Sequence, residues 1–145
     1  MVDDLYQEII IDHSKRPRNF HAMEDANRRA EGYNPLCGDK LKLYLKIEDD
    51  VVKDASFVGA GCAISTASAS LMTESLKGKS REEALKLLDR FHELLTTDTP
   101  VSQELGKLVV FCGVREYPAR VKCATLAWHT LKSALENHEE TVTTE

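Results

Sequence analysis

The amino-acid sequence predicts an α+β fold, in which a small three-stranded antiparallel sheet packs against about five helices. Two periodicities support this prediction. Apolar and polar residues alternate through much of residues 41–58, as in strands with one buried face. Outside this region, apolar residues recur at the spacing of amphipathic helices. Because 145 residues suffice for one hydrophobic core, we predict a single domain over residues 1–137 and a frayed tail over residues 138–145.

The N-terminal part of the chain supplies one helix and the sheet. The first helix is predicted over residues 3–15, where apolar residues recur at helical spacing. Strict alternation predicts a strand over residues 41–47, and a second run over residues 52–58 completes an antiparallel hairpin. The alternation of that second run is irregular near Asp54. Residues 29–33 are predicted to add the third strand.

Helices follow the sheet. Two glycines within residues 59–61 end the last strand, and apolar residues at helical spacing then predict a helix over residues 62–78. Ser80 and Glu83 form a capping box, in which each residue satisfies a backbone N–H group of the other. This motif begins a further helix that we expect to reach residue 95.

The last third of the chain contains two more predicted helices. Residues 101–110 fit a helix, although their valine-rich end is ambiguous. Pro118 is expected to interrupt the chain, and the final helix is predicted over residues 121–137, with Trp128 on its buried face.

Charge and hydropathy exclude several classes of function. The net charge is −5 and basic residues are scattered among acidic ones, which excludes a general attraction to nucleic acid. The N-terminus is acidic where a secretory signal would be basic and then apolar, and no apolar run is long enough to cross a membrane. We therefore expect a cytoplasmic protein that binds neither nucleic acid nor membranes.

Three of the four cysteines lie where the local structure changes. Cys37 lies in a turn before a strand, Cys62 at a helix start and Cys123 in the first turns of the last helix. In a reducing compartment, such cysteines favour metal or thiolate chemistry over disulfides. Clustered thiolates repel unless a cation neutralises them, and Asp39 is placed to be a fourth ligand. Such a set suits zinc, and its thiolates equally suit the iron of a cluster.

The spacing of these cysteines does not itself establish a shared site, because the chain contains no CxxC pair. Separate, buried structural cysteines are the alternative that the residues leave open. Cys112 does not share the sequence contexts of the other three cysteines, and we interpret it as a small, buried core residue.

The sequence around each of the three cysteines resembles a motif of the SufU, IscU and NifU N-terminal family of iron–sulfur cluster assembly proteins. The three motifs are NPLCGD at residues 34–39, GAGCAIS at residues 59–65 and RVKCATLAW at residues 120–128. DH at residues 12–13 and PRN at residues 17–19 resemble the family's N-terminal segment. STASAS at residues 65–70 resembles the helix after its second cysteine. The resemblance covers residues 5–135 and implies the SufU/IscU-like fold.

Two departures favour the SufU type within this family. IscU-type proteins have a histidine immediately before the third cysteine, where this chain has Lys122. The chain also has a longer stretch before Cys123, which resembles the insertion of SufU. The resemblance to SufU implies a zinc-dependent sulfurtransferase that accepts persulfide sulfur from a SufS-like cysteine desulfurase.

The resemblance also assigns roles to individual residues. One zinc ion per chain is expected to bind Cys37, Asp39, Cys62 and Cys123, and Cys37 is the expected catalytic sulfur acceptor. The main alternative is a scaffold on which Cys37, Cys62 and Cys123 hold iron or a [2Fe–2S] cluster for transfer to downstream acceptor proteins. Lys122 disfavours the scaffold, because it replaces a candidate histidine ligand. A zinc-stabilised interaction domain without chemistry is the third interpretation.

Several other polar residues have structural interpretations. His13 is expected to cap or orient the N-terminal helix. The remaining histidines show no ligand spacing and are expected on the surface; they are His21, His92, His129 and His138. Arg18 is a candidate docking residue. Arg120 and Lys122 fit either contacts to the sulfur site or a partner, or solvated positions at a helix start.

Overall fold

The computed structural model confirms the predicted α+β fold and describes residues 2–35, 38–97, 103–136 and 142–143. In chain order, its elements are α1 (Val2–Lys15), β1 (Arg28–Asn34), β2 (Asp39–Glu48), β3 (Val51–Ala60), α2 (Ala63–Leu76), α3 (Arg81–Thr96), the 3₁₀ helix η1 (Gln103–Glu116), α4 (Pro118–Leu135) and β4 (Val142–Thr143).

The sheet is an antiparallel meander of β1, β2 and β3, extended at one edge by a short strand. The strand order is β3-β2-β1-β4, and β4 pairs in parallel with β1. The β2–β3 hairpin turns at Asp49 and Asp50, both of which have positive φ, as in the two-residue turns that match the twist of a hairpin. The register of β2 and β3 shifts between Lys46 and Ile47, opposite the predicted irregularity near Asp54.

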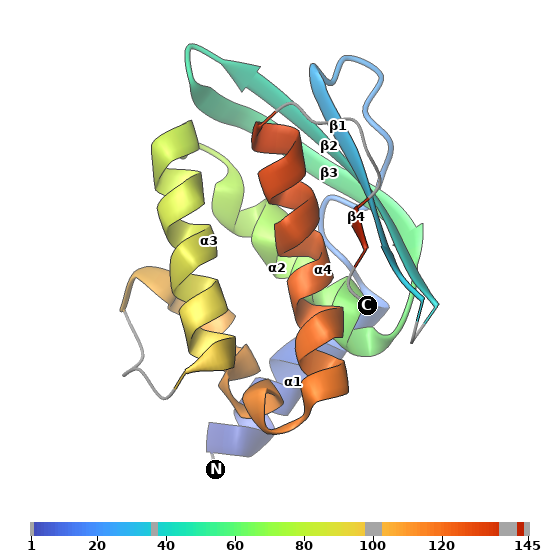
Figure 1. Ribbon diagram of the computed structural model, residues 1–145, viewed down its shortest axis with the longest axis vertical. Helices are drawn as coiled ribbons and strands as arrows, with labels where there is room; N and C mark the ends of the chain where they lie inside the picture. Colours follow the sequence, from blue (N-terminus) through green and yellow to red (C-terminus); the bar gives the residue numbers. More distant parts are fainter. Residues whose placement is uncertain (1, 36–37, 98–102, 137–141, 144–145) are drawn as a thin grey trace.

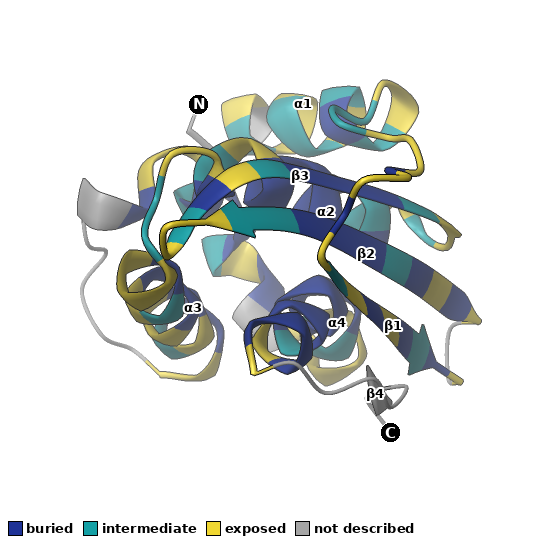
Figure 2. Cartoon of the chain, turned by 90° about the horizontal axis from the view of Figure 1, so that it is seen from above, coloured by how far each residue is buried: buried dark blue, intermediate teal, exposed yellow. Residues whose placement is uncertain are grey.

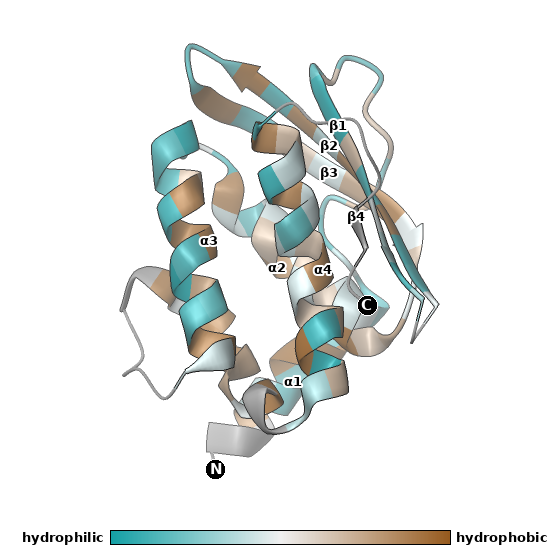
Figure 3. Cartoon of the chain, in the orientation of Figure 1, coloured by the Kyte–Doolittle hydropathy of each residue, from teal (hydrophilic) through white to brown (hydrophobic). Residues whose placement is uncertain are grey.

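α2 and α4 cover one face of this sheet, and the hydrophobic core lies between the two layers (Figure 1). α4 packs on β1 and β2, whereas α2 packs on β3. Seen from above, the buried residues of α2 and α4 lie beneath the sheet, and α3 is exposed on its outer side (Figure 2). Bands of hydrophobic and hydrophilic residues alternate along α3, as expected of an amphipathic helix (Figure 3). The predicted capping box of Ser80 and Glu83 is present at its start.

α2, α3 and α4 are joined through Trp128. Its indole stacks on Phe91 of α3 with ring centroids 4.5 Å apart, and its Nε1–H donates to Ser68 Oγ of α2 at 3.1 Å. Ser68 Oγ in turn donates to the carbonyl oxygen of Ala124 at 2.6 Å. The predicted core position of Trp128 is therefore confirmed, and its one polar atom is hydrogen-bonded inside the core.

Two predictions about the last third of the chain were wrong in detail. Residues 101–110 were expected to form a separate helix, but the structure has the longer 3₁₀ helix η1, interrupted at Gly106, whose φ is 54°. η1 ends at Glu116, so the predicted break at Pro118 is confirmed, but the final helix begins three residues earlier than expected, at Pro118. Pro118 is the first residue of α4, where the missing N–H group costs no hydrogen bond.

The C-terminal segment contains β4 within the range predicted to be a frayed tail. The residues on both sides of β4 lie outside the described part of the chain, so the domain boundaries stay a prediction. None of the helices in the described ranges combines the length and apolar composition that a membrane crossing requires.

Gly32 allows α4 to lie close against the sheet. A Cβ atom added at this position would collide with Thr130 Oγ1 and lie 3.0 Å from Leu126 Cδ1, both on α4. Thr130 Oγ1 is held by its own hydrogen bond to the carbonyl oxygen of Leu126 at 2.7 Å. The strand and the helix that carry two of the functional residues described below therefore meet where a side chain is absent.

We predict that Gly32→Ala lowers the free energy of unfolding by about 1–3 kcal/mol, the usual cost of overpacking a core. Urea denaturation followed by far-UV circular dichroism measures the change. Gly113→Ala is the matched control, because a Cβ atom there meets nothing within 4 Å. Equal stability of the two variants would contradict the close contact of β1 with α4.

Candidate metal centre

Three side chains from three different elements converge at one end of the sheet. Asp39 is the first residue of β2, Cys62 is the N-cap of α2 and Cys123 lies in the second turn of α4. One ligand atom from each, a carboxylate oxygen and two Sγ atoms, lie within 4.8 Å of one another. The structure thus brings together three of the four predicted ligands.

Backbone geometry around Cys62 fixes the carboxylate of Asp39. The N–H group of Cys62 donates to Asp39 Oδ1 at 2.8 Å. Gly61 makes this approach possible, because an added Cβ atom would lie only 2.5 Å from Asp39 Oδ1. The N–H group of Ser65 donates to Cys62 Sγ at 3.4 Å, so the N-terminus of α2 also places a partial positive charge beside the sulfur.

Asn34 is a member of this site that the sequence did not reveal. Its side-chain Nδ2 lies 3.4 Å from Asp39 Oδ2 and 3.5 Å from Cys123 Sγ. Asn34 is fully buried and is the last residue of β1, paired with Asp39 across the hairpin. The alternation of β1 indicates that Asn34 shares the inner face with Ala30 and Gly32, but only the approach of α4 brings Cys123 within its reach.

The chemistry of these donors fits a cation. Asp39 is 0% exposed and Cys123 is 3% exposed. Within the part of the chain that the structure describes, no lysine or arginine forms an ion pair with Asp39. The Cys62 Sγ also lies 3.9 Å from Asp39 Oδ2, so the two sulfurs and the carboxylate form one compact set of sulfur and oxygen ligands for a cation. Sulfur and oxygen ligands in a small group suit a tetrahedral zinc ion.

Cys37 lies outside the described residues, so its place among the ligands stays a prediction. Asn34 ends the strand before Cys37 in the sequence, and Asp39 begins the strand after it. These two described residues are paired with each other.

The other residues singled out in the sequence are not among the clustered ligands that the described part of the chain contains. Cys112 is half-buried against the core, so it is less enclosed than expected, and it is not among the clustered ligands of the described residues. The Arg120 guanidinium lies 5.0 Å from the ring centroid of exposed Tyr117. His21 and His92 are exposed and His129 is half-buried, whereas His138 lies outside the described ranges.

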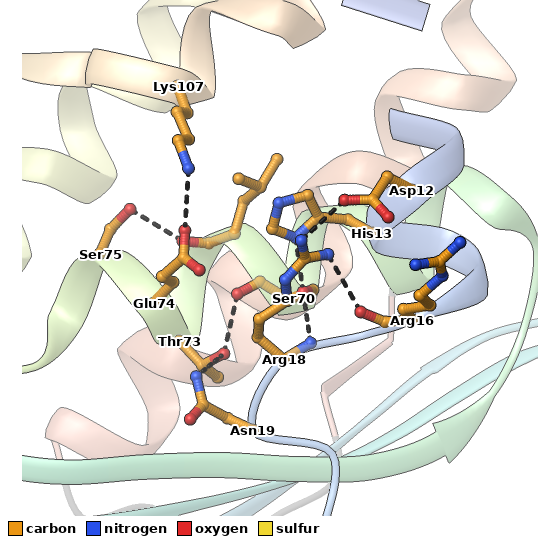
Figure 4. Close-up of polar contacts among 11 residues, drawn as sticks. Asp12, His13, Arg16, Arg18, Asn19, Ser70, Thr73, Glu74, Ser75 and Lys107 are labelled. Atoms are coloured by element: carbon orange, nitrogen blue, oxygen red, sulfur yellow. Dashed lines mark hydrogen bonds and ion pairs between the residues drawn. The ribbon is translucent and has the colours of Figure 1, made fainter. Parts of the chain in front are cut away.

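His13 orients α1, as predicted, and it does so by a contact with α2 (Figure 4). Its Nδ1 lies 2.7 Å from Ser70 Oγ, which also accepts the backbone N–H of Arg18 at 2.8 Å. The Arg18 guanidinium forms an ion pair with Asp12 at 2.7 Å. Arg18 therefore has a structural role in closing the end of α1, and its predicted docking role is not tested by these contacts.

His13 should make stability depend on pH. Burial lowers the pKa of His13 below its ordinary 6.5, and the Arg18 guanidinium acts in the same direction. As the pH falls from 6.5 towards the folded-state pKa, the unfolded chain binds a proton that the folded chain does not. The contribution of His13 is therefore present above pH 6.5 and lost on acidification through that window.

We predict that the free energy of unfolding falls less between neutral pH and about pH 5 in His13→Asn than in the unaltered chain. Urea denaturation across this range measures both slopes. His21→Asn, which replaces an exposed histidine, should keep the original slope. Identical slopes for all three proteins would show that His13 is not held neutral by its surroundings.

The chain is similar to known proteins along nearly its whole length. The model of the NifU-like N-terminal domain matches residues 5–144. The zinc-dependent sulfurtransferase SufU of Bacillus subtilis is 41% identical over 139 residues, which are 95% of this chain and 94% of that protein. The iron–sulfur cluster assembly scaffold protein IscU of Streptococcus pyogenes is 44% identical over 135 residues, which are 92% of this chain and 84% of that protein.

A solved structure with the same fold carries a similar description. The crystal structure of an iron–sulfur cluster assembly scaffold protein for the SUF system, from Fervidobacterium islandicum, superposes with a TM-score of 0.82. It is 38% identical, and the match covers 88% of this chain and 94% of that structure.

Proposed function

Because the chain belongs to the NifU-like N-terminal domain family, we propose that it works in iron–sulfur cluster assembly as a zinc-dependent sulfurtransferase. Its substrate is the persulfide of a cysteine desulfurase of the SufS type, and the sulfur passes on to downstream assembly proteins. On the sequence argument alone, we place this activity in the cytoplasm. The grouping of Asp39, Cys62 and Cys123 at one point is the observation that carries the proposal.

In this proposal Cys37, Asp39, Cys62 and Cys123 hold one zinc ion per chain. Bound zinc keeps its cysteine ligands deprotonated at neutral pH. Three of these residues come from rigid elements, namely a strand and two helices, and two of them are buried. The resemblance to the SufU type makes Cys37 the expected reacting residue.

The proposed chemical step is a thiol–persulfide exchange. The Cys37 thiolate attacks the terminal sulfur of the desulfurase persulfide, and a new S–S bond forms between Cys37 Sγ and that sulfur. The S–S bond within the desulfurase persulfide breaks, and its electron pair leaves with the desulfurase cysteine as a thiolate. The transferred sulfur stays at the same oxidation level, so the step needs no further oxidant or reductant.

Asp39 has a distinct role in this proposal. A carboxylate is a harder ligand than a thiolate, so Asp39 would be the most weakly held of the four proposed zinc ligands. Its Oδ1 already accepts the N–H group of Cys62, so the carboxylate stays oriented when the other ligands change. The weak attachment would let the site rearrange when Cys37 reacts, while the hydrogen bond from Cys62 keeps the carboxylate nearby.

A scaffold function is the second candidate, because relatives named as IscU scaffold proteins match at similar identity. The same thiolates and carboxylate suit the iron of a [2Fe–2S] cluster. Lys122 occupies the position before Cys123, where its side chain is half-buried and cannot replace an imidazole as a neutral ligand. Brown, iron-containing protein after purification without air would favour the scaffold over sulfur transfer.

We predict that Cys37→Ala abolishes both the stimulation of a cysteine desulfurase and the appearance of a persulfide on this chain. Desulfurase turnover with cysteine, and intact mass before and after reduction, measure the two effects. Cys112→Ala is the matched control, since Cys112 lies outside the ligand group, and it should retain both. A Cys37 variant that still gains one reducible sulfur atom would contradict the assignment.

A further inference from the structure

We infer that Asn34 is a positioning residue of this metal centre, whose amide group ties the sulfur of Cys123 to the carboxylate of Asp39. The inference rests on the proposed metal site and adds a residue that does not itself bind the metal. It is carried by the two contacts of Nδ2, which lies 3.4 Å from Asp39 Oδ2 and 3.5 Å from Cys123 Sγ.

The chemistry of the two neighbours fixes the orientation of the amide. An ionised carboxylate only accepts hydrogen bonds, and a thiolate likewise only accepts them. The NH₂ end of Asn34, rather than its oxygen, must therefore face both groups. An amide NH₂ has two N–H bonds, so it can donate one to each partner.

These contacts complete a chain of hydrogen bonds through all three described ligands. The N–H group of Cys62 donates to Asp39 Oδ1, and Asn34 Nδ2 donates to Asp39 Oδ2 and to Cys123 Sγ. Each oxygen of the carboxylate thus has its own donor. The protein thus holds the ligands from β2, α2 and α4 in place before a metal binds. Little conformational freedom is then lost on metal binding.

The fold explains why an asparagine stands at this position. Asn34 is 0% exposed and faces the core, where an unpaired amide would be costly. Gly32, two residues earlier on the same face of β1, lets α4 approach at Leu126, one helical turn beyond Cys123. A bulky apolar residue at position 34 would fill the space but would leave the sulfur and the carboxylate without this donor.

A hydrogen bond to a metal-bound thiolate has an electronic effect. The N–H dipole draws electron density from the sulfur, so the sulfur donates less charge to the metal and its charge-transfer transitions need more energy. Removing the donor should shift the sulfur-to-cobalt band of the cobalt-loaded protein to longer wavelength. Removing an orienting partner should also speed metal loss, because such partners typically contribute about 10–100-fold to metal affinity.

The experiment compares Asn34→Leu and Asn34→Ala with the unaltered chain. Cobalt(II) absorption in the near ultraviolet reports on the sulfur, and the rate of zinc transfer to a coloured chelator reports on metal retention. Both variants should shift the band to longer wavelength and release zinc about 10–100-fold faster. A purely structural role of Asn34 would not move the cobalt band when the variant is folded.

Asn27→Leu is the matched control. Asn27 precedes β1 at the end opposite Asn34, where its Nδ2 donates to the carbonyl oxygen of Ile47 at 2.6 Å and its Oδ1 accepts the Ile47 N–H at 2.8 Å. This variant also loses the hydrogen bonds of one asparagine side chain, but far from the ligands along the strand. It should keep the original cobalt spectrum and zinc release rate.

A measurement on the unaltered chain makes the inference independent of how the variants fold. In protein loaded with NMR-active cadmium, we expect a scalar coupling between the metal and one Asn34 side-chain amide proton, transmitted through the N–H···S bond. Absence of this coupling, or an unchanged band and release rate in folded Asn34 variants, would overturn the inference. Failure of the unaltered chain to bind cobalt or zinc would instead overturn the proposed function.

Discussion

The close approach of two sulfur atoms and a carboxylate inside the protein is the constraint on which the rest of this structure depends. Asp39 and Cys123 are buried, and their ligand atoms lie within 4.8 Å of each other and of Cys62. Hydrogen-bond donors hold such a group together, and a bound cation would offset the repulsion that arises once the thiols are deprotonated. The backbone N–H of Cys62 and the amide of Asn34 supply donors, and the proposed metal ion supplies the charge.

Two glycines make this concentration of groups sterically possible. Gly32 lets α4 approach β1, and Gly61 lets the start of α2 approach the carboxylate of Asp39. The same packing is supported at a distance by Trp128 and Ser68, which join α2 to α4 inside the core. Stability and site geometry are therefore linked, because a shift of α4 on the sheet would move Cys123 away from Asp39.

Local patterns in the sequence predicted most elements but not the full site. Strict alternation defined β2, and the pairing of Ser80 with Glu83 marked the start of α3, because both signals act within a few residues. The extent of η1 and the start of α4 at Pro118 were missed, since backbone geometry at Gly106 and Tyr117 decides them. From the sequence, Asn34 is only one residue of the NPLCGD motif. Its role depends on the strand register and on a helix 89 residues later in the chain.

The most direct test of the account is X-ray absorption spectroscopy at the zinc edge of the zinc-loaded protein. The account predicts one zinc site with three sulfur neighbours at about 2.3 Å and one oxygen neighbour at about 2.0 Å, supplied by the cysteines and Asp39. A zinc ion surrounded by nitrogen and oxygen alone would contradict it, because the metal would then lie away from the group formed by Cys62 and Cys123.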